Sequence, residues 1–252
     1  MADSTPNYSY RANPQVSANQ MAEYLYATAP RRKSIIRDAR FPKKSVVAQY
    51  RTARDCLVDF LVDGTRSLNH IARAIDQLSR REARPTATEW LRRDSRSSIE
   101  AIEAFQRSYN RLGLAPINCE RTHGRQPPLV FGPTKVSVTL NVITRKRNLD
   151  GPDSIGGAIF IFSRGESSSR KRVERCKTIA GLAYDFCLAH LSTLGTADTS
   201  ICFGVDVFGR KSYKPQGTFA RKRRQIQDSC DEIASRWRTV APPSDYDGPD
   251  PD

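Results

Sequence analysis

Two strand patterns of different kinds lie close together between residues 135 and 163, and they constrain the fold more than any other feature. From Val136 to Val142, apolar residues alternate with polar ones, which is typical of a strand with one face in a core. From Ala158 to Ser163, the sequence AIFIFS is almost continuously apolar, which indicates a strand buried on both faces. Such a strand needs covering layers on both sides of its sheet, so we expect a mixed α/β (α+β) fold.

Helical patterns occupy much of the remaining chain. Ser17 followed by Gln20 has capping-box spacing, and so do Ser97 with Glu100 and Thr86 with Glu89. These pairs predict helices that start near residues 17 and 97, with a short helix near residue 90. Apolar residues at spacings of three and four extend the helical prediction to residues 47–61, 68–78, 169–191 and 218–240.

The segment 202–213 predicts a hairpin whose turn includes Gly209 and Arg210, with Asp206 available to cap it. A short strand is also expected at PLVFG, residues 128–132. From these patterns we predict a disordered segment over 1–15, a helical N-terminal region over 16–96 and a domain with a small central sheet flanked by helices over 97–240. The tail 241–252 contains four prolines and four aspartates, so we expect it to be acidic, Pro-rich and disordered.

The charge of the chain favours a polyanionic partner. It has 41 Lys and Arg against 27 Asp and Glu, a net charge of +14. Basic side chains displace condensed counterions from phosphates, so nucleic acid is the expected partner, although a basic surface with no such partner has the same composition. The candidate nucleic-acid-binding residues are Arg31, Arg32, Lys33, Arg37, Lys43, Lys44, Arg145, Lys146, Arg147, Arg170, Lys171, Arg172, Arg221, Lys222, Arg223 and Arg224.

Several classes of protein lack their signals in this sequence. No apolar run reaches the roughly 18 residues of a membrane span, and no apolar signal-peptide segment occurs near the N-terminus. The six cysteines form no CxxC pair and the three histidines are scattered, which predicts reduced thiols in a cytoplasmic protein without a zinc site. The motifs GxSxG, GxGxxG and HExxH, and a Walker loop, are also absent.

The basic segment 31–44 allows two interpretations. Two short helices separated by Pro30 could form a helix-turn-helix, in which the second helix enters a DNA groove. The same two helices could instead belong to a bundle, with their arginines in solvent. The sequence leaves both interpretations open.

From residue 97 the order helix, short strand at PLVFG, strand, strand, helix, strand resembles the core of the PD-(D/E)XK nuclease superfamily, over about residues 97–210. In the exonuclease-like branch, a strand G-x-L-D-x-I precedes a strand I-D-[FY]-K-T-G. Here VSVTLNVITRK and GAIFIFSRGE take these two places, and Phe162 and Gly165 match the aromatic residue and the glycine. Asn141 then stands at the position of the first carboxylate, Ile161 at the second and Ser163 at the lysine.

The resemblance implies a core without its metal chemistry. Nucleases of this kind use carboxylates to hold Mg²⁺ and a lysine near the attacking water, and the residues at 141, 161 and 163 supply neither. We therefore expect no catalytic residue, no bound metal and no cofactor. The alternative is an active Mg²⁺-dependent nuclease whose site is built elsewhere, from Asp150, Asp153, Asp206 and Lys211.

The predicted function is nucleic-acid binding by a pseudonuclease core, in a nucleic-acid processing or defence-type complex. Protein partners or self-association fit the same sequence, and no membrane contact is expected. A second alternative is a protein-interaction scaffold subunit whose positive charge is incidental. The sequence does not distinguish DNA from RNA.

Overall fold

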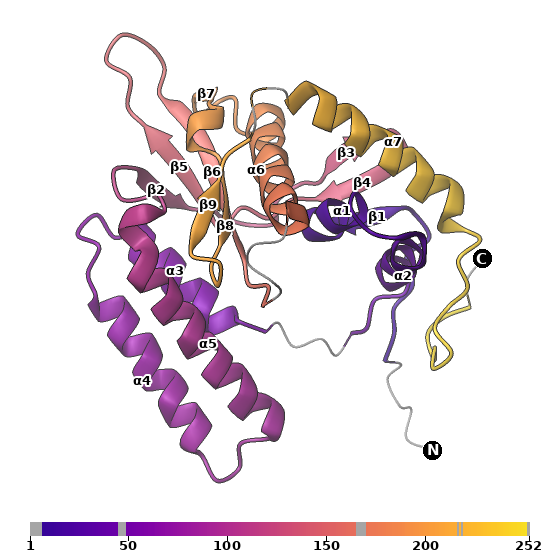
Figure 1. Cartoon of the computed structure of the whole chain (residues 1–252), viewed down its shortest axis with the longest axis horizontal. Helices are drawn as coiled ribbons and strands as arrows, with labels where there is room; N and C mark the ends of the chain where they lie inside the picture. Colours follow the sequence, from indigo (N-terminus) through magenta and orange to yellow (C-terminus); the bar gives the residue numbers. More distant parts are fainter. Residues whose placement is uncertain (1–6, 45–48, 165–169, 216, 218, 251–252) are drawn as a thin grey trace. The chain divides into compact units, whose positions relative to one another are not determined.

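A computed structural model describes residues 7–44, 49–164, 170–215, 217 and 219–250. Val47, Gly165 and the expected helix starts at Ser169 and Thr218 lie outside these residues. The described chain has a mixed α+β fold, as predicted, with helices and two mixed sheets (Figure 1). No helix in the described part of the chain combines the length and the apolar character that crossing a membrane requires.

The chain divides into two compact units, and each is assembled from separate segments. Unit 1 contains Met1–Val47, Gln126–Val138 and Gly217–Asp252, and unit 2 contains Ala48–Arg125 and Thr139–Gln216. This division differs from the predicted one, in which a helical region ended at residue 96. The sequence boundary followed local periodicity, whereas the units are defined by pairing between segments far apart in the chain.

The described part of unit 1 contains a short sheet and three helices. Within the described residues, the strand order is β1–β4–β3, with β1 parallel and β3 antiparallel to β4. Helix α7 contacts β3 and β4, and α2 contacts both β1 and α7. Ser17 and Gln20 form the predicted capping box at the start of α1. The elements are β1 (Gln15–Ser17), α1 (Ala18–Tyr24), α2 (Ala29–Arg40), β3 (Leu129–Phe131), β4 (Thr134–Ser137) and α7 (Phe219–Trp237).

Arg40 is the buried charge that joins two of these helices. It lies at the end of α2 with 2% of its surface exposed. Its Nη1 donates hydrogen bonds to the carbonyl oxygens of Trp237, Arg238 and Val240 at 2.8, 2.9 and 3.0 Å. The last carbonyls of a helix have no intrahelical partner, and a cation there also interacts favourably with the helix dipole. Arg40 therefore caps the end of α7.

Within unit 1, residues 7–8 contact residues 245–247, which lie far away in the sequence. Asp247 accepts hydrogen bonds from the backbone N–H groups of Asn7 and Tyr8, and Asp245 accepts one from the Tyr8 hydroxyl. The rings of Phe41 and Tyr246 meet edge to face, with 4.9 Å between their centroids. The predicted disorder of both termini thus differs from what the structure has at residues 7–15 and 241–250. The polar, Pro-rich composition of these segments gave no sign that they would contact each other.

Unit 2 is built around a larger sheet. Among the described residues its strand order is β2–β5–β6–β8–β9, with β7 beside β6; β5 is antiparallel to both β2 and β6, whereas β6 and β8 are parallel. Its strands are β2 (Asn118–Arg121), β5 (Val142–Lys146), β6 (Ser154–Ile161), β7 (Thr196–Ala197), β8 (Phe203–Asp206) and β9 (Lys211–Tyr213). Its helices are α3 (Arg51–Val62), α4 (Asn69–Ala83), α5 (Glu89–Ser108), η1 (Tyr109–Arg111), α6 (Arg170–His190) and η2 (Thr199–Ile201).

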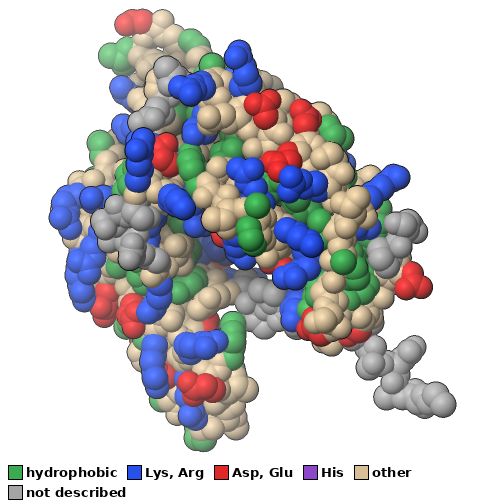
Figure 2. All heavy atoms as spheres, turned by 45° about the vertical axis from the view of Figure 1, so that its right-hand side comes forward, with side chains coloured by type: hydrophobic (Ala, Val, Ile, Leu, Met, Phe, Trp, Pro, Cys, Tyr) green, Lys and Arg blue, Asp and Glu red, His purple; other side chains and the backbone are tan. Residues whose placement is uncertain are grey.

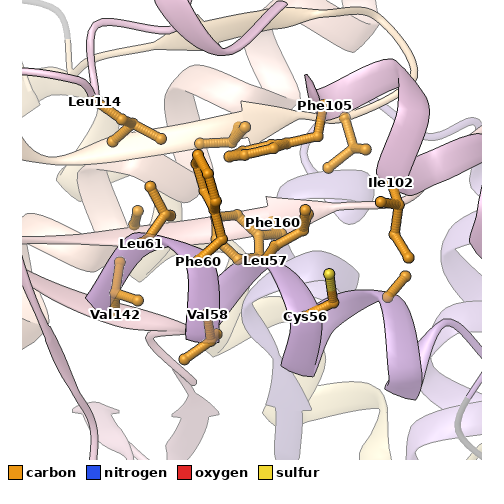
Figure 3. Close-up of a cluster of buried hydrophobic side chains, with 14 of the residues drawn as sticks. Cys56, Leu57, Val58, Phe60, Leu61, Ile102, Phe105, Leu114, Val142 and Phe160 are labelled. Carbon is orange, nitrogen blue, oxygen red and sulfur yellow. The ribbon is translucent and has the colours of Figure 1, made fainter. Parts of the chain in front are cut away.

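Helices cover both faces of β6, as the continuous apolar run predicted. On one face, Phe160 packs with Phe60 of α3 and Phe105 of α5 in the main hydrophobic cluster of unit 2 (Figure 3). On the other face, α6 contacts β6 and β8. This approach is close, because a Cβ atom added at Gly204 would lie 2.3 Å from the carbonyl oxygen of Cys176. The central strand is therefore buried on both sides.

Two local predictions are wrong. The alternating pattern from Val136 to Val142 is not one strand: β4 ends at Ser137, and β5 begins at Val142 in a different sheet. The helix predicted to start at Ser97 is the middle of α5, whose N-cap is Thr88, and Ser97 is buried. Capping-box spacing and strand alternation are local signals. Packing between distant segments decides whether such a signal marks the start of a helix or one continuous strand.

Removal of the Arg40 guanidinium should destabilise unit 1. In Arg40→Met, three carbonyl groups at the end of α7 are left without their donor, so we expect the free energy of unfolding to fall by about 3 kcal/mol. The protein has two tryptophans, Trp90 in α5 and the buried Trp237 in α7. Urea unfolding followed by fluorescence in a Trp90→Phe background therefore reports on unit 1.

The control for this measurement is Arg31→Met on the same helix. Arg31 pairs with Glu23 at 2.7 Å, and half of its side chain is exposed. Such surface ion pairs contribute about 0–1 kcal/mol. Equal unfolding midpoints for Arg40→Met and Arg31→Met would contradict the capping role of Arg40.

Candidate nucleic-acid interface

The carboxyl ends of β6 and β8 lie side by side and form the edge of the sheet where the residues of the predicted nuclease core collect. The two strands are parallel, and Ile161 at the end of β6 is paired in register with Asp206 at the end of β8. Loops at the carboxyl ends of parallel strands are the usual place for binding groups in α/β folds. We call this region the carboxyl edge.

Asn141 has a structural role at this edge. Its side-chain Oδ1 accepts a hydrogen bond from the backbone N–H of Phe160 at 2.7 Å, and its own N–H donates to the carbonyl oxygen of Ala158 at 2.9 Å. It is 8% exposed. The amide therefore extends the pairing of β5 with β6. Ile161 and Ser163 are both partly buried, and neither side chain offers a charged group.

Asp206 is buried and neutralised by Arg172. Two nitrogens of the Arg172 guanidinium, Nε and Nη2, donate to the two oxygens of the Asp206 carboxylate, with an Nε–Oδ2 distance of 2.5 Å. The side chains of Asp206 and Arg172 are 1% and 9% exposed. The hydrogen bond to Asp206 is the main cause that raises the pKa of Arg172 above its usual value. A buried carboxylate needs such a partner, because an unpaired charge away from water is very costly.

The same pair also fixes the loops of the carboxyl edge. Arg172 Nη2 donates to the carbonyl oxygen of Ser163 at 2.7 Å. Asp206 Oδ1 accepts from the backbone N–H of Gly209 at 2.9 Å, which is the hairpin cap that the sequence predicted. The pair thus connects the start of α6 with the segment after β6 and with the β8–β9 turn. Arg172 was predicted to contact nucleic acid, whereas the structure has its guanidinium bonded to Asp206 and Ser163 inside the protein.

The alternative catalytic residues do not gather into one group. Asp150 is exposed in the loop between β5 and β6, and Asp153 pairs with Arg145 at 3.4 Å. Lys211 is opposite Asp206 in the β8–β9 register and is exposed. In the described part of the chain, no cluster of three or more His, Cys, Asp or Glu side chains could hold a metal ion.

An aromatic group with two arginines lies beside the carboxyl edge. Tyr50 stacks on Phe162 with 5.0 Å between centroids and meets Phe208 edge to face at 5.8 Å. The guanidinium of Arg54 lies 5.6 Å from the Phe162 ring, and that of Arg164 lies 4.8 Å from the Phe208 ring. Sequence analysis missed this group. The available signal was an aromatic residue just past the end of each of β6 and β8.

The candidate cations of unit 2 differ in availability. Arg170 and Lys171, in the first turn of α6, are exposed and have no ion-pair partner among the described residues. Lys146, the last residue of β5, and Arg147, the first residue after it, are also exposed and have no such partner in the described chain. Arg145 instead donates to Glu120 at 2.7 Å, which is the main cause that raises its pKa.

In unit 1, most of the candidate cations on and just after α2 already have acidic partners. The ion pairs are Arg31–Glu23 at 2.7 Å, Arg32–Glu232 at 3.2 Å, Arg37–Asp38 at 3.5 Å and Lys43–Asp245 at 3.2 Å. On α7, Lys222 donates to the Tyr26 hydroxyl at 2.6 Å, and Arg223 lies over the Phe219 ring. Those left exposed, with no ion pair to any described residue, are Lys33, Lys44, Arg221 and Arg224.

The cations are therefore dispersed over the surface. Figure 2 shows Lys and Arg side chains across the face in view, with Asp and Glu side chains among them.

All six cysteines are free and buried, and burial raises the pKa of Cys56, Cys176 and Cys230 to about 12. This outcome agrees with the prediction of core thiols.

Comparisons with protein families, curated proteins and solved structures gave no match to this chain.

Disruption of the Arg172–Asp206 pair should destabilise unit 2. In Arg172→Met the Asp206 carboxylate stays buried without its partner, and removal of one member of such a pair costs about 3–5 kcal/mol of unfolding free energy. The double variant Arg172→Met/Asp206→Leu should recover part of this stability, because it removes both charges together. Urea unfolding followed by circular dichroism measures each variant.

Arg80→Met provides the comparison, since Arg80 forms an exposed pair with Asp76 at 2.9 Å on α4. Its effect should stay below about 0.5 kcal/mol. Two results would contradict the proposed dependence on the pair. One is that Arg172→Met is as stable as the wild type, and the other is that Arg172→Met/Asp206→Leu is clearly less stable than Arg172→Met alone.

Proposed function

We propose that the protein binds nucleic acid through exposed basic residues and that its nuclease-like core binds without cleaving. The observation that carries this proposal is the distribution of charge at the start of α6. Arg172 and Asp206 neutralise each other inside the protein. Arg170 and Lys171 in the same turn are exposed and have no acidic partner among the described residues. The carboxyl edge therefore has an excess of positive charge at its surface.

Phosphate groups are the ligands that fit the positive charge at the carboxyl edge. The first N–H groups of a helix have no intrahelical acceptor, and the positive end of the helix dipole lies with them, so helix starts favour anions. Arginine and lysine side chains add ionic contacts, which release counterions from the nucleic acid. Rings and guanidinium groups together bind unpaired bases in other proteins, but here Tyr50 is buried and stacked on Phe162 and Arg164 pairs with Glu100 at 2.6 Å, so the aromatic group adds only secondary support.

The order of elements supports the nuclease-like part of the proposal. In unit 2 the sequence α5, β2, β5, β6, α6, β8 has three strands paired antiparallel in succession and then a helix that leads to a strand parallel to the third. The PD-(D/E)XK resemblance implies this kind of order, with β2 in the place that the sequence had given to PLVFG. Fold-level likeness alone does not carry function, so the residues decide.

The residues favour binding over cleavage. A metal-dependent nuclease needs carboxylates that are open to a hydrated cation. At the carboxyl edge, Asn141 is engaged with the backbone of Phe160, and Asp206 is bonded to a guanidinium. An intracellular setting agrees with this role, because free thiols persist in reducing compartments.

Binding should fall steeply with salt and should depend on the exposed cations. We expect Arg170→Glu/Lys171→Glu, and separately Arg221→Glu/Arg224→Glu, to weaken binding to labelled DNA and RNA in fluorescence anisotropy. Removal of one phosphate contact should reduce the slope of log affinity against log salt by about 1. The matched control is Arg80→Glu/Arg107→Glu, which makes the same change in net charge on α4 and α5.

Three results would separate the alternatives. Equal weakening in the control and in both test variants would mean that only net charge matters. No binding by the wild type at low salt would favour a scaffold role in protein assembly. Cleavage in Mg²⁺ or Mn²⁺ that Asp150→Ala, Asp153→Ala or Asp206→Asn abolishes, without disruption of the fold, would establish the nuclease alternative and contradict the proposal.

A further inference from the structure

The hairpin loop between β5 and β6 projects beyond the strands of unit 2 (Figure 1), whereas the paired parts of β5 and β6 are flanked by β2 and β7 almost to their ends. The two strands remain paired up to Lys146 and Ser154, and residues 147–153 connect them. The loop contains the sequence RNLDGPD, which is polar apart from one leucine and a proline. An arm of this kind contributes little to a core, so its residues are open to another role.

Side-chain contacts hold the arm in a defined shape. Arg145 donates to Glu120 on β2, to Asp153 on the far side of the loop and to the carbonyl oxygen of Leu194, at 2.7, 3.4 and 3.1 Å. Asn148 Nδ2 donates across the loop to the carbonyl oxygen of Pro152 at 2.8 Å. These bonds fix both the base and the tip of the arm, so a side chain at the tip is presented in one place.

The tip presents a leucine between charged residues. Leu149 is 93% exposed, the largest exposure among the large apolar residues that the structure describes as exposed. Lys146 and Arg147 precede it, are exposed and have no ion-pair partner among the described residues. Asp150 follows it and is exposed as well, so the tip also carries one negative charge.

We propose that this hairpin is a double-stranded DNA-binding arm, in which Leu149 inserts at a base step while Lys146 and Arg147 contact the flanking phosphates. The inference rests on the proposed function and adds to it the form of nucleic acid and the mode of contact. The loop 147–153 is the part of the hairpin that enters a groove of B-form DNA in this proposal, and such a groove admits elements as wide as a two-stranded β-ribbon. Apolar side chains at the tips of such elements enter between base pairs and kink the duplex.

The chemistry of the arm favours DNA over duplex RNA. The major groove of A-form RNA is too narrow for side chains to read, and its minor groove is recognised by 2′-hydroxyl contacts, which need polar groups. Leu149 offers none. Insertion is easiest at pyrimidine–purine steps, because these steps unstack most readily. The negative charge of Asp150 repels phosphate, so its neutralisation should increase the affinity for DNA independently of Leu149.

The experiment uses the full chain and DNA duplexes with 2-aminopurine at TA steps. Insertion unstacks the fluorescent base, so the wild type should raise its emission severalfold. Leu149→Ala should abolish most of this rise while it keeps the salt slope of the wild type. Lys146→Gln/Arg147→Gln should weaken binding and lower the slope by about 2. Asp150→Asn should tighten binding.

Leu188→Ala is the matched control, since it removes another exposed leucine, on α6, that is 45% exposed. It should keep the wild-type emission. Melting curves must coincide for Leu149→Ala and the wild type, as the exposure of Leu149 predicts.

Four results would overturn the proposal. Salt-sensitive DNA binding without any rise in emission would show that Leu149 does not insert between bases, although the proposed function would still hold. Absence of DNA binding would overturn both. Equal emission from Leu149→Ala and the wild type would show that another group unstacks the base. Binding to anionic phospholipid vesicles that Leu149→Ala abolishes, with DNA emission unchanged, would assign the tip to a membrane surface.

Discussion

The ion pair between Arg172 and Asp206 is the interaction on which the arrangement of unit 2 depends. It joins the start of α6 to the end of β8, and it also bonds to the segment after β6 and to the β8–β9 turn. Parallel strands require a crossover connection, and here α6 supplies it between β6 and β8. A buried carboxylate at the end of β8 then needs a cation, and the first turn of α6 provides one. The same bond that fixes the helix on the sheet thereby occupies the carboxylate that metal chemistry would use.

Arginine has two different roles in this protein. Arg172 in unit 2 and Arg40 in unit 1 are buried and bonded to oxygen atoms of neighbouring elements. Their planar guanidinium groups donate several hydrogen bonds in fixed directions, which a lysine ammonium group cannot reproduce. Other cations, such as Arg170 and Lys171, remain exposed next to Arg172 in the chain. The net charge of the sequence counts both kinds equally, although only the exposed kind can meet a phosphate.

The sequence predicted the parts of the fold that local chemistry decides. The burial of β6 followed from its apolar run, the β8–β9 turn from Gly209 and Arg210, and the start of α1 from Ser17 and Gln20. The division into units did not follow, because alternation looks the same whether one strand continues or two strands join different sheets, as β4 and β5 do. The inward position of Arg172 also had no local signal. Its neighbours Arg170 and Lys171 have the same character, and only the position of Asp206, 34 residues away, distinguishes it.

The central claim is that the exposed cations near the carboxyl edge and on the β5–β6 arm contact nucleic acid directly. Photo-cross-linking to duplex and single-stranded oligonucleotides that contain 5-iodouracil, followed by mass spectrometry of the peptides, measures this contact. The account predicts cross-linked peptides that contain Arg147 or Arg170, at yields that decrease as salt is raised. Cross-links confined to α4 and α5, or none at low salt, would contradict it.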